Sequence, residues 1–286
     1  MLSDAELVAA ARERAAGSSV IITFANSFYA DVLMNWLVAL SLQSIDNYVV
    51  IALDRELHAT LSDRGIPSLL CELKSDLGDL WVQRIRVFAT LCDAGVDFVH
   101  SDADAVWLRD PRQLYFTDAD VDLIASQGTV WPPDVHQQFG FVLCCGLFRL
   151  RSTPVSRQLL TELESHVLVS RDDQVSLNRL LAARSIKWHV EPADGYYLAL
   201  GTKRFLCSRS LIRGDAADGL RTAILPHHLF QRVPVNLDDQ PYVSHFLTPK
   251  DPQAKMHEFA RHGHLFVRAD WREQKFDVTS LATLRR

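Results

Sequence analysis

Short apolar runs alternate with longer amphipathic stretches over most of the chain. Short apolar runs are typical of buried strands, and apolar residues spaced three or four apart are typical of helices. We predict strands at residues 20–24, 48–53, 68–71, 97–101, 141–150, 187–190, 222–225 and 242–246. We predict helices at residues 30–42, 80–94, 172–184 and 252–261, and another that begins at 153–154. This alternation favours an α/β domain with a largely parallel central sheet.

The N-terminal segment is predicted to form a helix within residues 1–17, because Ser3 and Glu6 have the spacing of a capping box. It has no basic start followed by an apolar run, so it does not resemble a secretory signal. The most apolar stretch, residues 32–42, is interrupted by Asn35 and is shorter than the roughly 20 residues that span a bilayer. We therefore expect a soluble, cytoplasmic protein, and peripheral attachment to a membrane stays open.

The composition is that of a globular protein, with 48% hydrophobic and 23% charged residues among 286. These values exclude a disordered chain and a coiled-coil rod. The net charge of −5 argues against nucleic acid as the main partner, since nucleic-acid binders carry a basic excess. The five cysteines are odd in number and form no CxxC pair. We therefore expect small buried side chains rather than a disulfide framework or a zinc site.

Two acidic residues, Asp102 and Asp104, directly follow the predicted strand at 97–101. In an extended chain, residues i and i+2 point to the same side, so both carboxylates can converge on one cation. Ligands of open α/β sheets bind beyond the carboxyl ends of the strands, which is where this pair lies. A hard divalent cation prefers such oxygen ligands and can neutralise a departing diphosphate. The same spacing at 118–120 and 120–122 is interpreted as solvated turns.

The sequence around this acidic pair resembles one protein family. Residues 98–111 read FVHSDADAVWLRDP, and residues 101–111 match every specified position of the pattern SDxDxxWLRDP. That pattern is similar to the metal-binding turn of the nucleotide-diphospho-sugar transferase family that includes the plant rhamnogalacturonan-II xylosyltransferases. The resemblance implies a single GT-A domain over residues 1–286, of the α/β class, with a mixed, mainly parallel central sheet. Its nucleotide-binding half would span about 18–126, and its acceptor half about 127–286.

The resemblance also implies a function. Since the family consists of retaining glycosyltransferases, we expect a sugar to move from a nucleotide diphosphate sugar, a UDP-sugar, to an acceptor hydroxyl. Asp102 and Asp104 should hold Mn²⁺ or Mg²⁺ together with the diphosphate of this donor. A diphosphate oxygen can serve as the base, so no side chain is named as a general base. The acceptor would be a glycan, a small molecule or a protein, bound by loops at 128–140 and 194–213.

Further donor contacts are carried over from the family one residue at a time. Arg84 or Arg86 stands where relatives have a basic residue near the donor, and the choice between them stays open. Asp54 is placed to bind the base or the ribose, but it is an equally good cap for a helix that begins at Arg55. The other positions expected at the nucleotide and the metal-binding turn are Thr23, Phe24, Ala25, Asn26, Ser101 and Ala103.

Asp173 and Gln174 resemble an Asp-Gln element that lines the sugar and acceptor site in the family, and they are the candidates for catalytic roles. Asp172 would cap the helix that begins there. Cys144 stands where the family has Asn, in a strand of the pattern N-x-G-x-F/Y. Because Cys144 lacks the amide group of Asn, we do not expect it to make the contact with sugar or acceptor that this Asn would make in the family.

His245 follows a predicted strand late in the chain, where related GT-A enzymes have a further metal ligand. A lysine that reaches the diphosphate comes after it in those enzymes, and Lys250 and Lys255 are both candidates for that lysine. Imidazole suits Mn²⁺ better than Mg²⁺. The adjacent residues His227 and His228 are a second choice as metal ligands.

Two other interpretations stay open. Asp102 and Asp104 also fit the DxDx[TV] motif of haloacid-dehalogenase-type phosphohydrolases, in which Asp102 would attack phosphorus as the nucleophile. Residues 214–218, GDAAD, nearly match the later acidic motif of that class. However, the DxD motif of that class normally ends the first strand, whereas three predicted strands precede it here. The third interpretation is a non-catalytic sugar-nucleotide-binding protein, in which some of the six tryptophans would stack on sugars.

Overall fold

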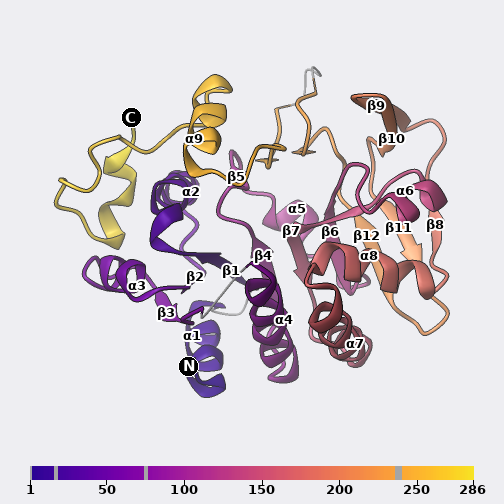
Figure 1. The fold of residues 1–286 in the computed structure, drawn as a ribbon, viewed down its shortest axis with the longest axis horizontal. Coiled ribbons are helices and arrows are strands. Elements are labelled where there is room, and N and C mark those ends of the chain that lie inside the picture. The colour runs from indigo at the N-terminus through magenta and orange to yellow at the C-terminus, as the bar shows by residue number, and fades with distance from the viewer. Residues whose placement is uncertain (1, 16–18, 74–76, 236–239) are drawn as a thin grey trace.

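A central sheet of nine strands organises the computed structural model, which describes residues 2–15, 19–73, 77–235 and 240–286 (Figure 1). Two of its strands, β7 (Leu143–Leu150) and β11 (Ile212–Asp215), run antiparallel to their neighbours, so most of the strands point the same way. The predicted α/β class and the mixed, mainly parallel sheet are confirmed. In spatial order the strands are β3 (Ser68–Leu70), β2 (Tyr48–Ala52), β1 (Val20–Ala25), β4 (Phe98–Ser101), β7 (Leu143–Leu150), β6 (Leu123–Gln127), β12 (Arg221–Ile224), β11 (Ile212–Asp215) and β8 (Lys187–His189).

Helices cover both faces of this sheet, and each helix layer encloses its own apolar core. The first layer consists of α1 (Asp4–Ala15), α4 (Leu77–Asp93), α7 (Pro154–Ser170) and α8 (Asp173–Ala183). The second layer consists of α2 (Ala30–Leu42), α3 (Arg55–Ser62), α9 (Pro252–Arg261) and the 3₁₀ helix η2 (Val278–Leu284). α2 is apolar almost all round because it is buried along most of its length.

The predicted N-terminal helix corresponds to α1, and its capping box is confirmed. The main-chain N of Glu6 donates to Ser3 Oγ at 3.3 Å, and the main-chain N of Ser3 donates to Glu6 Oε2 at 3.3 Å. Residues 1 and 16–17 of the predicted segment lie outside the described residues.

The cysteines lie in the interior, as expected for small apolar side chains. All five of them, Cys71, Cys92, Cys144, Cys145 and Cys207, are buried. Within the described ranges, no helix combines the length and the apolar character needed to cross a bilayer.

A second, small sheet lies at the carboxyl end of β4. In this sheet β5 (Val106–Trp107) pairs antiparallel with β14 (Val243–Ser244), which pairs in parallel with β13 (Phe230–Gln231). The strand predicted at 242–246 is therefore shorter than expected, and it belongs to this small sheet. In Figure 1, β5 lies between the end of β4 and α9, so the small sheet brings the late part of the chain to this edge.

Two segments that were expected to be loops contain regular structure, which corrects that expectation. Residues 128–140 contain α6 (Pro133–Phe139), which has Pro at its first position and ends at Gly140 with a φ of 80°. Residues 194–213 contain an antiparallel hairpin, and the main-chain N of Leu206 donates to Gly140 O at 2.8 Å. The hairpin consists of β9 (Gly195–Leu200) and β10 (Lys203–Ser208). The remaining short helices are η1 (Ser27–Tyr29) and α5 (Arg112–Tyr115).

Asn35 joins α2 to the C-terminal segment, which explains the polar residue in an apolar run. Its side chain is buried, and Oδ1 accepts hydrogen bonds from the main-chain N of Phe266 at 2.6 Å and of Val267 at 3.2 Å. Its Nδ2 donates to His264 O at 3.0 Å. The amide thus pairs main-chain groups that would otherwise be costly to bury.

Replacing Asn35 with Leu keeps the number and the branching of the side-chain heavy atoms and removes these three hydrogen bonds. We expect the free energy of unfolding to fall by about 3 kcal/mol, because buried main-chain groups lose their partner. Urea denaturation measures the loss, with Ser41→Ala in the last turn of the same helix as the control. Wild-type stability of N35L would contradict the role given to this amide.

Candidate metal centre

The acidic turn begins where β4 ends, and two main-chain hydrogen bonds fix it, one to β7 and one within the turn. The main-chain N of Asp102 donates to the O of Gly146 in β7 at 2.7 Å, and the main-chain N of Ala105 donates to Asp102 O at 2.9 Å. The turn therefore carries Asp102 and Asp104 beyond the carboxyl end of the strand. This is the edge at which open α/β sheets bind their ligands.

The neighbouring positions Ser101 and Ala103 support this turn from beneath. Ser101 Oγ accepts hydrogen bonds from the indole Nε1 of Trp36 and of Trp107, each at 3.1 Å. Both Ser101 and Ala103 are buried. Their buried side chains support the turn, and the contact with a donor that the sequence predicts for these two positions stays a prediction.

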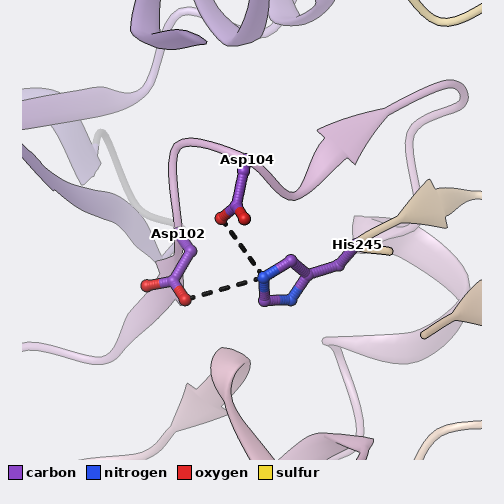
Figure 2. Close-up of side chains that lie close together, drawn as sticks. All are labelled: Asp102, Asp104 and His245. Carbon is purple, nitrogen blue, oxygen red and sulfur yellow. Dashed lines mark ion pairs between the residues drawn. The ribbon is translucent and has the colours of Figure 1, made fainter. Parts of the chain in front are cut away.

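β14 brings His245 to the turn from a late part of the sequence. Ser244 lies opposite Val106 in the antiparallel pairing, so the next residue reaches the acidic pair. His245 Nε2 lies 3.2 Å from Asp104 Oδ1 and 3.7 Å from Asp102 Oδ2 (Figure 2). One ligand atom from each of the three residues lies within 4.8 Å of the others. Two carboxylates and one imidazole suit a divalent cation, and Mn²⁺ in particular.

Gly146 gives this cluster the space that it needs. A Cβ at this position would lie 2.1 Å from His245 Cε1 and 2.5 Å from Asp102 Oδ2. These distances are too short for non-bonded atoms, so any residue other than Gly would displace His245 or Asp102. Gly within a strand indicates a close approach of another group, so the sequence did contain a signal for this position.

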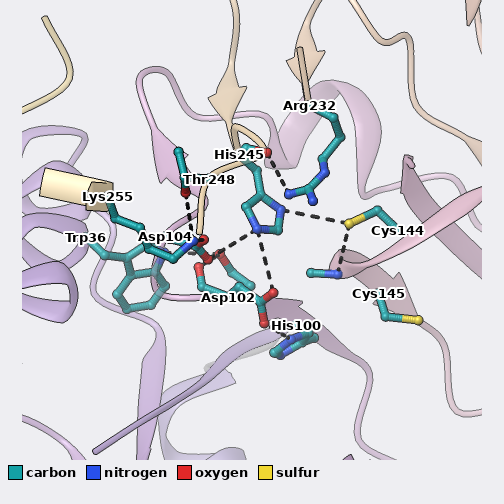
Figure 3. Close-up of polar contacts among 12 residues, drawn as sticks. Trp36, His100, Asp102, Asp104, Cys144, Cys145, Arg232, His245, Thr248 and Lys255 are labelled. Atoms are coloured by element: carbon teal, nitrogen blue, oxygen red, sulfur yellow. Dashed lines mark hydrogen bonds and ion pairs between the residues drawn. The ribbon is translucent and has the colours of Figure 1, made fainter. Parts of the chain in front are cut away.

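Of the two candidate lysines, Lys255 is the one at the acidic turn. It comes from α9, is buried, and forms an ion pair through Nζ with Asp104 Oδ2. The same Nζ donates to Thr248 Oγ1 at 3.0 Å (Figure 3). Lys250 Nζ lies 5.1 Å from the ring centroid of Trp81 in α4, and the same ring lies 4.6 Å from Cζ of Arg84, so a contact of Lys250 with the diphosphate stays a prediction.

Of the two candidate arginines, Arg84 is the one that reaches the acidic turn. It is buried in α4, and its Nη1 donates to Asp102 Oδ1 at 2.9 Å while its Nη2 bonds to Asp173 Oδ2. Two residues further on, Arg86 lies on the opposite side of the helix and pairs with Glu164 Oε1 of α7 at 2.8 Å. The structure therefore favours Arg84 over Arg86 as the arginine near the donor. Arg84 joins the carboxylates of Asp102 and Asp173.

His100 lies beneath Asp102, although the sequence analysis did not single it out. Its Nε2 is 3.0 Å from Asp102 Oδ1, and its Nδ1 is 3.0 Å from the O of Ile22 in β1. Burial, together with the charge of Arg84, lowers the pKa of His100 to about 4. The alternation of a strand places residues 100 and 102 on one side, so this neighbour was predictable.

The charges of the cluster support one another. Burial raises the pKa of both carboxyls, but the neighbouring cations lower these pKa values by more. The cation beside Asp102 is Arg84, and those beside Asp104 are His245 and Lys255. The pKa values of both acids therefore lie well below their usual range. Burial lowers the pKa of His245, but Asp104 more than compensates, so this pKa is raised to about 9.

The Asp-Gln element begins α8. Asp172 caps this helix, as expected, because its Oδ1 accepts a hydrogen bond from the main-chain N of Val175 at 2.8 Å. Asp173 is buried in the ion pair with the arginine described above, and burial raises its pKa against the effect of that cation. Gln174 Nε2 donates to the O of Trp131 at 2.9 Å. Asp173 is thus joined to the acidic turn through one arginine, and Gln174 lies beside an exposed aromatic residue.

The end of β1 and the residue after it were predicted to contact the nucleotide. The side chains of Thr23 and Ala25 are buried, and Phe24 lies edge-on to Phe88. Asn26 Oδ1 accepts a hydrogen bond at 3.2 Å from the main-chain N of the last residue of η1. A contact of these residues with a nucleotide stays a prediction.

Asp54 caps α3, which is one of the two roles considered for it. Its Oδ1 accepts a hydrogen bond from the main-chain N of Leu57 at 2.8 Å. Its Oδ2 accepts from the main-chain N of Ser27 at 2.7 Å and from the hydroxyl of the same residue at 2.9 Å. Both oxygens therefore join protein groups, and the contact with a base or ribose stays a prediction.

In the part of the chain that the structure describes, the second-choice ligands His227 and His228 belong to no group of three potential metal ligands. His227 is buried against the ring of Phe205, and its Nε2 accepts a hydrogen bond from the main-chain N of Arg232 at 3.3 Å. Among the described residues, the group of at least three potential ligands consists of Asp102, Asp104 and His245, without His227 or His228.

The later acidic motif of the phosphohydrolase interpretation lies far from Asp102. Residues 214–218 lie on and after β11, and three strands separate β11 from β4 in the sheet. Asp215 pairs with His189 at 3.2 Å, and Asp218 pairs with Arg184 at 2.9 Å. The two motifs therefore do not form one site.

A comparison with protein families adds the decisive observation, because residues 43–273 match the family described as nucleotide-diphospho-sugar transferase. The chain belongs to this family. The resemblance at 101–111 is thereby confirmed at the level of the family.

Individual relatives are more distant. Arabinosyltransferase XEG113 of Arabidopsis thaliana is 24% identical over 208 residues, which cover 65% of this chain and 32% of that protein. The chain thus spans about a third of the length of this curated relative. The glycosyltransferase GlyE of Streptococcus pneumoniae TIGR4 aligns with 94% of this chain and 66% of its own, at 12% identity and a TM-score of 0.47. Glucosyl-3-phosphoglycerate synthase of Mycobacterium tuberculosis, in complex with Mn²⁺, uridine-diphosphate and glucosyl-3-phosphoglycerate, aligns with 72% of this chain and 91% of its own, at 14% identity and a TM-score of 0.34.

Replacing Gly146 with Ala tests the geometry of the cluster. The new Cβ must displace His245 or Asp102, so we expect the affinity for Mn²⁺ to fall by at least about tenfold. Titration followed by the electron paramagnetic resonance of free Mn²⁺ measures this. Gly195→Ala is the matched control, because its Cβ would meet the nearest atom at 3.6 Å. Equal affinities of G146A and wild type would contradict the assigned geometry.

Burial of His227 predicts a loss of stability in acid. Burial, with a contribution from Arg232, lowers the pKa of His227 to about 3. The unfolded chain, with an ordinary pKa of about 6.5, takes up the proton first, so stability falls as the pH drops below that value. Between pH 7 and pH 5, wild type should lose about 2 kcal/mol more than His227→Gln, measured by urea denaturation. Parallel losses in the two proteins would contradict this role.

Proposed function

We propose that this protein transfers a sugar from a nucleotide diphosphate sugar to a hydroxyl group of an acceptor. The observation that carries this proposal is the convergence of Asp102, Asp104 and His245 at the carboxyl end of β4. Membership in the nucleotide-diphospho-sugar transferase family supports the class of the donor. A glycan, a small molecule or a protein would carry the acceptor hydroxyl.

The metal ion in this proposal is Mn²⁺ or Mg²⁺. It would be held by an oxygen of Asp102, an oxygen of Asp104 and Nε2 of His245, and this donor set fits such an ion. When bound, the ion supplies positive charge to the departing nucleoside diphosphate. The imidazole favours Mn²⁺ over Mg²⁺.

The other charged residues of the cluster have distinct tasks in this proposal. Arg84, buried beneath the turn, keeps Asp102 ionised and fixes one of its oxygens. Lys255 lies at Asp104, so its positive charge is close to the diphosphate of a donor bound there. Asp173 and Gln174, at the start of α8, would bind the transferred sugar and orient it toward the acceptor.

UDP as the nucleotide and retention of the anomeric configuration also belong to this proposal, and the family resemblance supports them. In a retaining transfer, the acceptor hydroxyl attacks from the face that the diphosphate leaves. An oxygen of the diphosphate then takes the hydroxyl proton, so no side chain has to act as the base. The name of the Arabidopsis relative makes UDP-arabinose the first donor to test.

The proposal predicts Mn²⁺-dependent release of UDP when the protein is incubated with the correct member of a panel of UDP-sugars. We expect Asp102→Asn and Asp104→Asn to lower this rate by at least about 100-fold, because each removes a negative ligand of the ion, and the ion supplies the positive charge that stabilises the departing diphosphate. Asp120→Asn is the matched control, since Asp120 belongs to a second Asp-x-Asp pair and is exposed. Chromatographic measurement of UDP gives the rates.

Two other results would favour the alternatives. Release of phosphate from simple phosphomonoesters, with no turnover of any nucleotide sugar, would favour the phosphohydrolase. Mn²⁺-dependent binding of a nucleotide sugar without turnover for any acceptor would favour a non-catalytic binding protein.

A further inference from the structure

The sulfur of Cys144 lies at the ring nitrogen of His245 that faces away from the acids. Nε2 of His245 points to Asp104 and Asp102, while Nδ1 lies 3.9 Å from Cys144 Sγ (Figure 3). Cys144 is in β7 and is buried, so its sulfur is fixed by the central sheet. The imidazole therefore lies between a carboxylate pair and a single sulfur.

Two N–H groups converge on this sulfur. The main-chain N of Gly146 donates to Sγ at 3.4 Å, so the sulfur already acts as an acceptor there. The second group is Nδ1 of His245, at a distance suited to the larger radius of sulfur. Arg232 adds positive charge on the same side, because its Nη1 donates to His245 O at 2.6 Å. These surroundings favour the sulfur as an acceptor of hydrogen bonds.

The state of Nδ1 determines what Nε2 can do. A metal ion can bind Nε2 only through its lone pair, so the proton of the neutral ring must be on Nδ1. A ligating histidine usually donates this second N–H to an acceptor of the protein, which fixes the tautomer and the orientation of the ring. Here the polar atom that faces Nδ1 is Cys144 Sγ.

We propose that Cys144 is a positioning residue of the metal site, whose sulfur accepts the Nδ1–H of His245 and aims Nε2 at the ion. This inference rests on the proposed metal site and deepens it. The sulfur itself does not bind the ion in this arrangement, because the ring separates it from the carboxylates. A side chain at position 144 must therefore accept a hydrogen bond, and Ser satisfies this requirement whereas Val and Ala do not.

The test compares the Mn²⁺ affinity of wild type with that of Cys144→Ser, Cys144→Val and Cys144→Ala, using the electron paramagnetic resonance of free Mn²⁺. We expect C144V and C144A to bind about 10–100-fold more weakly, as losses of such outer partners do, and C144S to stay close to wild type. Val and Ala bracket the size of Cys, so a shared loss is not a packing effect. Thermal melting without metal checks that all variants are folded.

A double-mutant cycle with His245→Gln separates positioning from general damage. If Cys144 acts through the imidazole, C144V should weaken Mn²⁺ binding in wild type but add no further loss in H245Q. Equal losses in both backgrounds, or wild-type affinity of C144V and C144A, would overturn the inference. Absence of Mn²⁺ binding by wild type would contradict the metal site itself, and the positioning role with it. Binding by wild type that is unchanged in C144V would contradict the positioning role alone.

Discussion

The antiparallel pairing of β14 with β5 is the constraint on which the candidate site depends. It sets Ser244 opposite Val106, so that the next residue, His245, is directed to the acidic turn. A slip of this register by one residue would turn His245 to the other face of the small sheet. Lys255 follows on α9 and reaches Asp104 from the same late part of the chain. The early half of the sequence supplies the acids, and the late half supplies the imidazole and the ammonium group.

Electrostatic balance keeps this cluster of buried charges together. Arg84 lies between Asp102 and Asp173, and His245 and Lys255 both lie against Asp104. Removing one member of such a network leaves an unpaired buried charge, which costs more than an exposed ion pair contributes. The same surroundings hold the pKa of both carboxyls of the turn low, so they are ionised at neutral pH. Ionised oxygens in fixed positions are what a divalent cation requires.

The sequence predicted the elements that have strong local patterns. The apolar run that ends in the acidic pair identified β4 and its turn, and the capping box identified the start of α1. The hairpin within 194–213 was missed although Gly201, with a φ of 59°, lies between its two strands and is a usable turn signal. β5 and β13 have two residues each, which is too short for any periodicity to be recognised.

The contacts within the site depend on packing that local patterns do not contain. Arg84 and Arg86 are equivalent until it is known which face of α4 lies on the sheet. His245 and Lys255 came from the family resemblance, because their partners are remote in sequence. The most direct test is a crystal structure with Mn²⁺ and UDP, using the anomalous signal of manganese. The account predicts one ion within coordination distance of Asp102, Asp104 and Nε2 of His245, in contact with the diphosphate. An ordered UDP with manganese bound elsewhere, away from this turn, would contradict it.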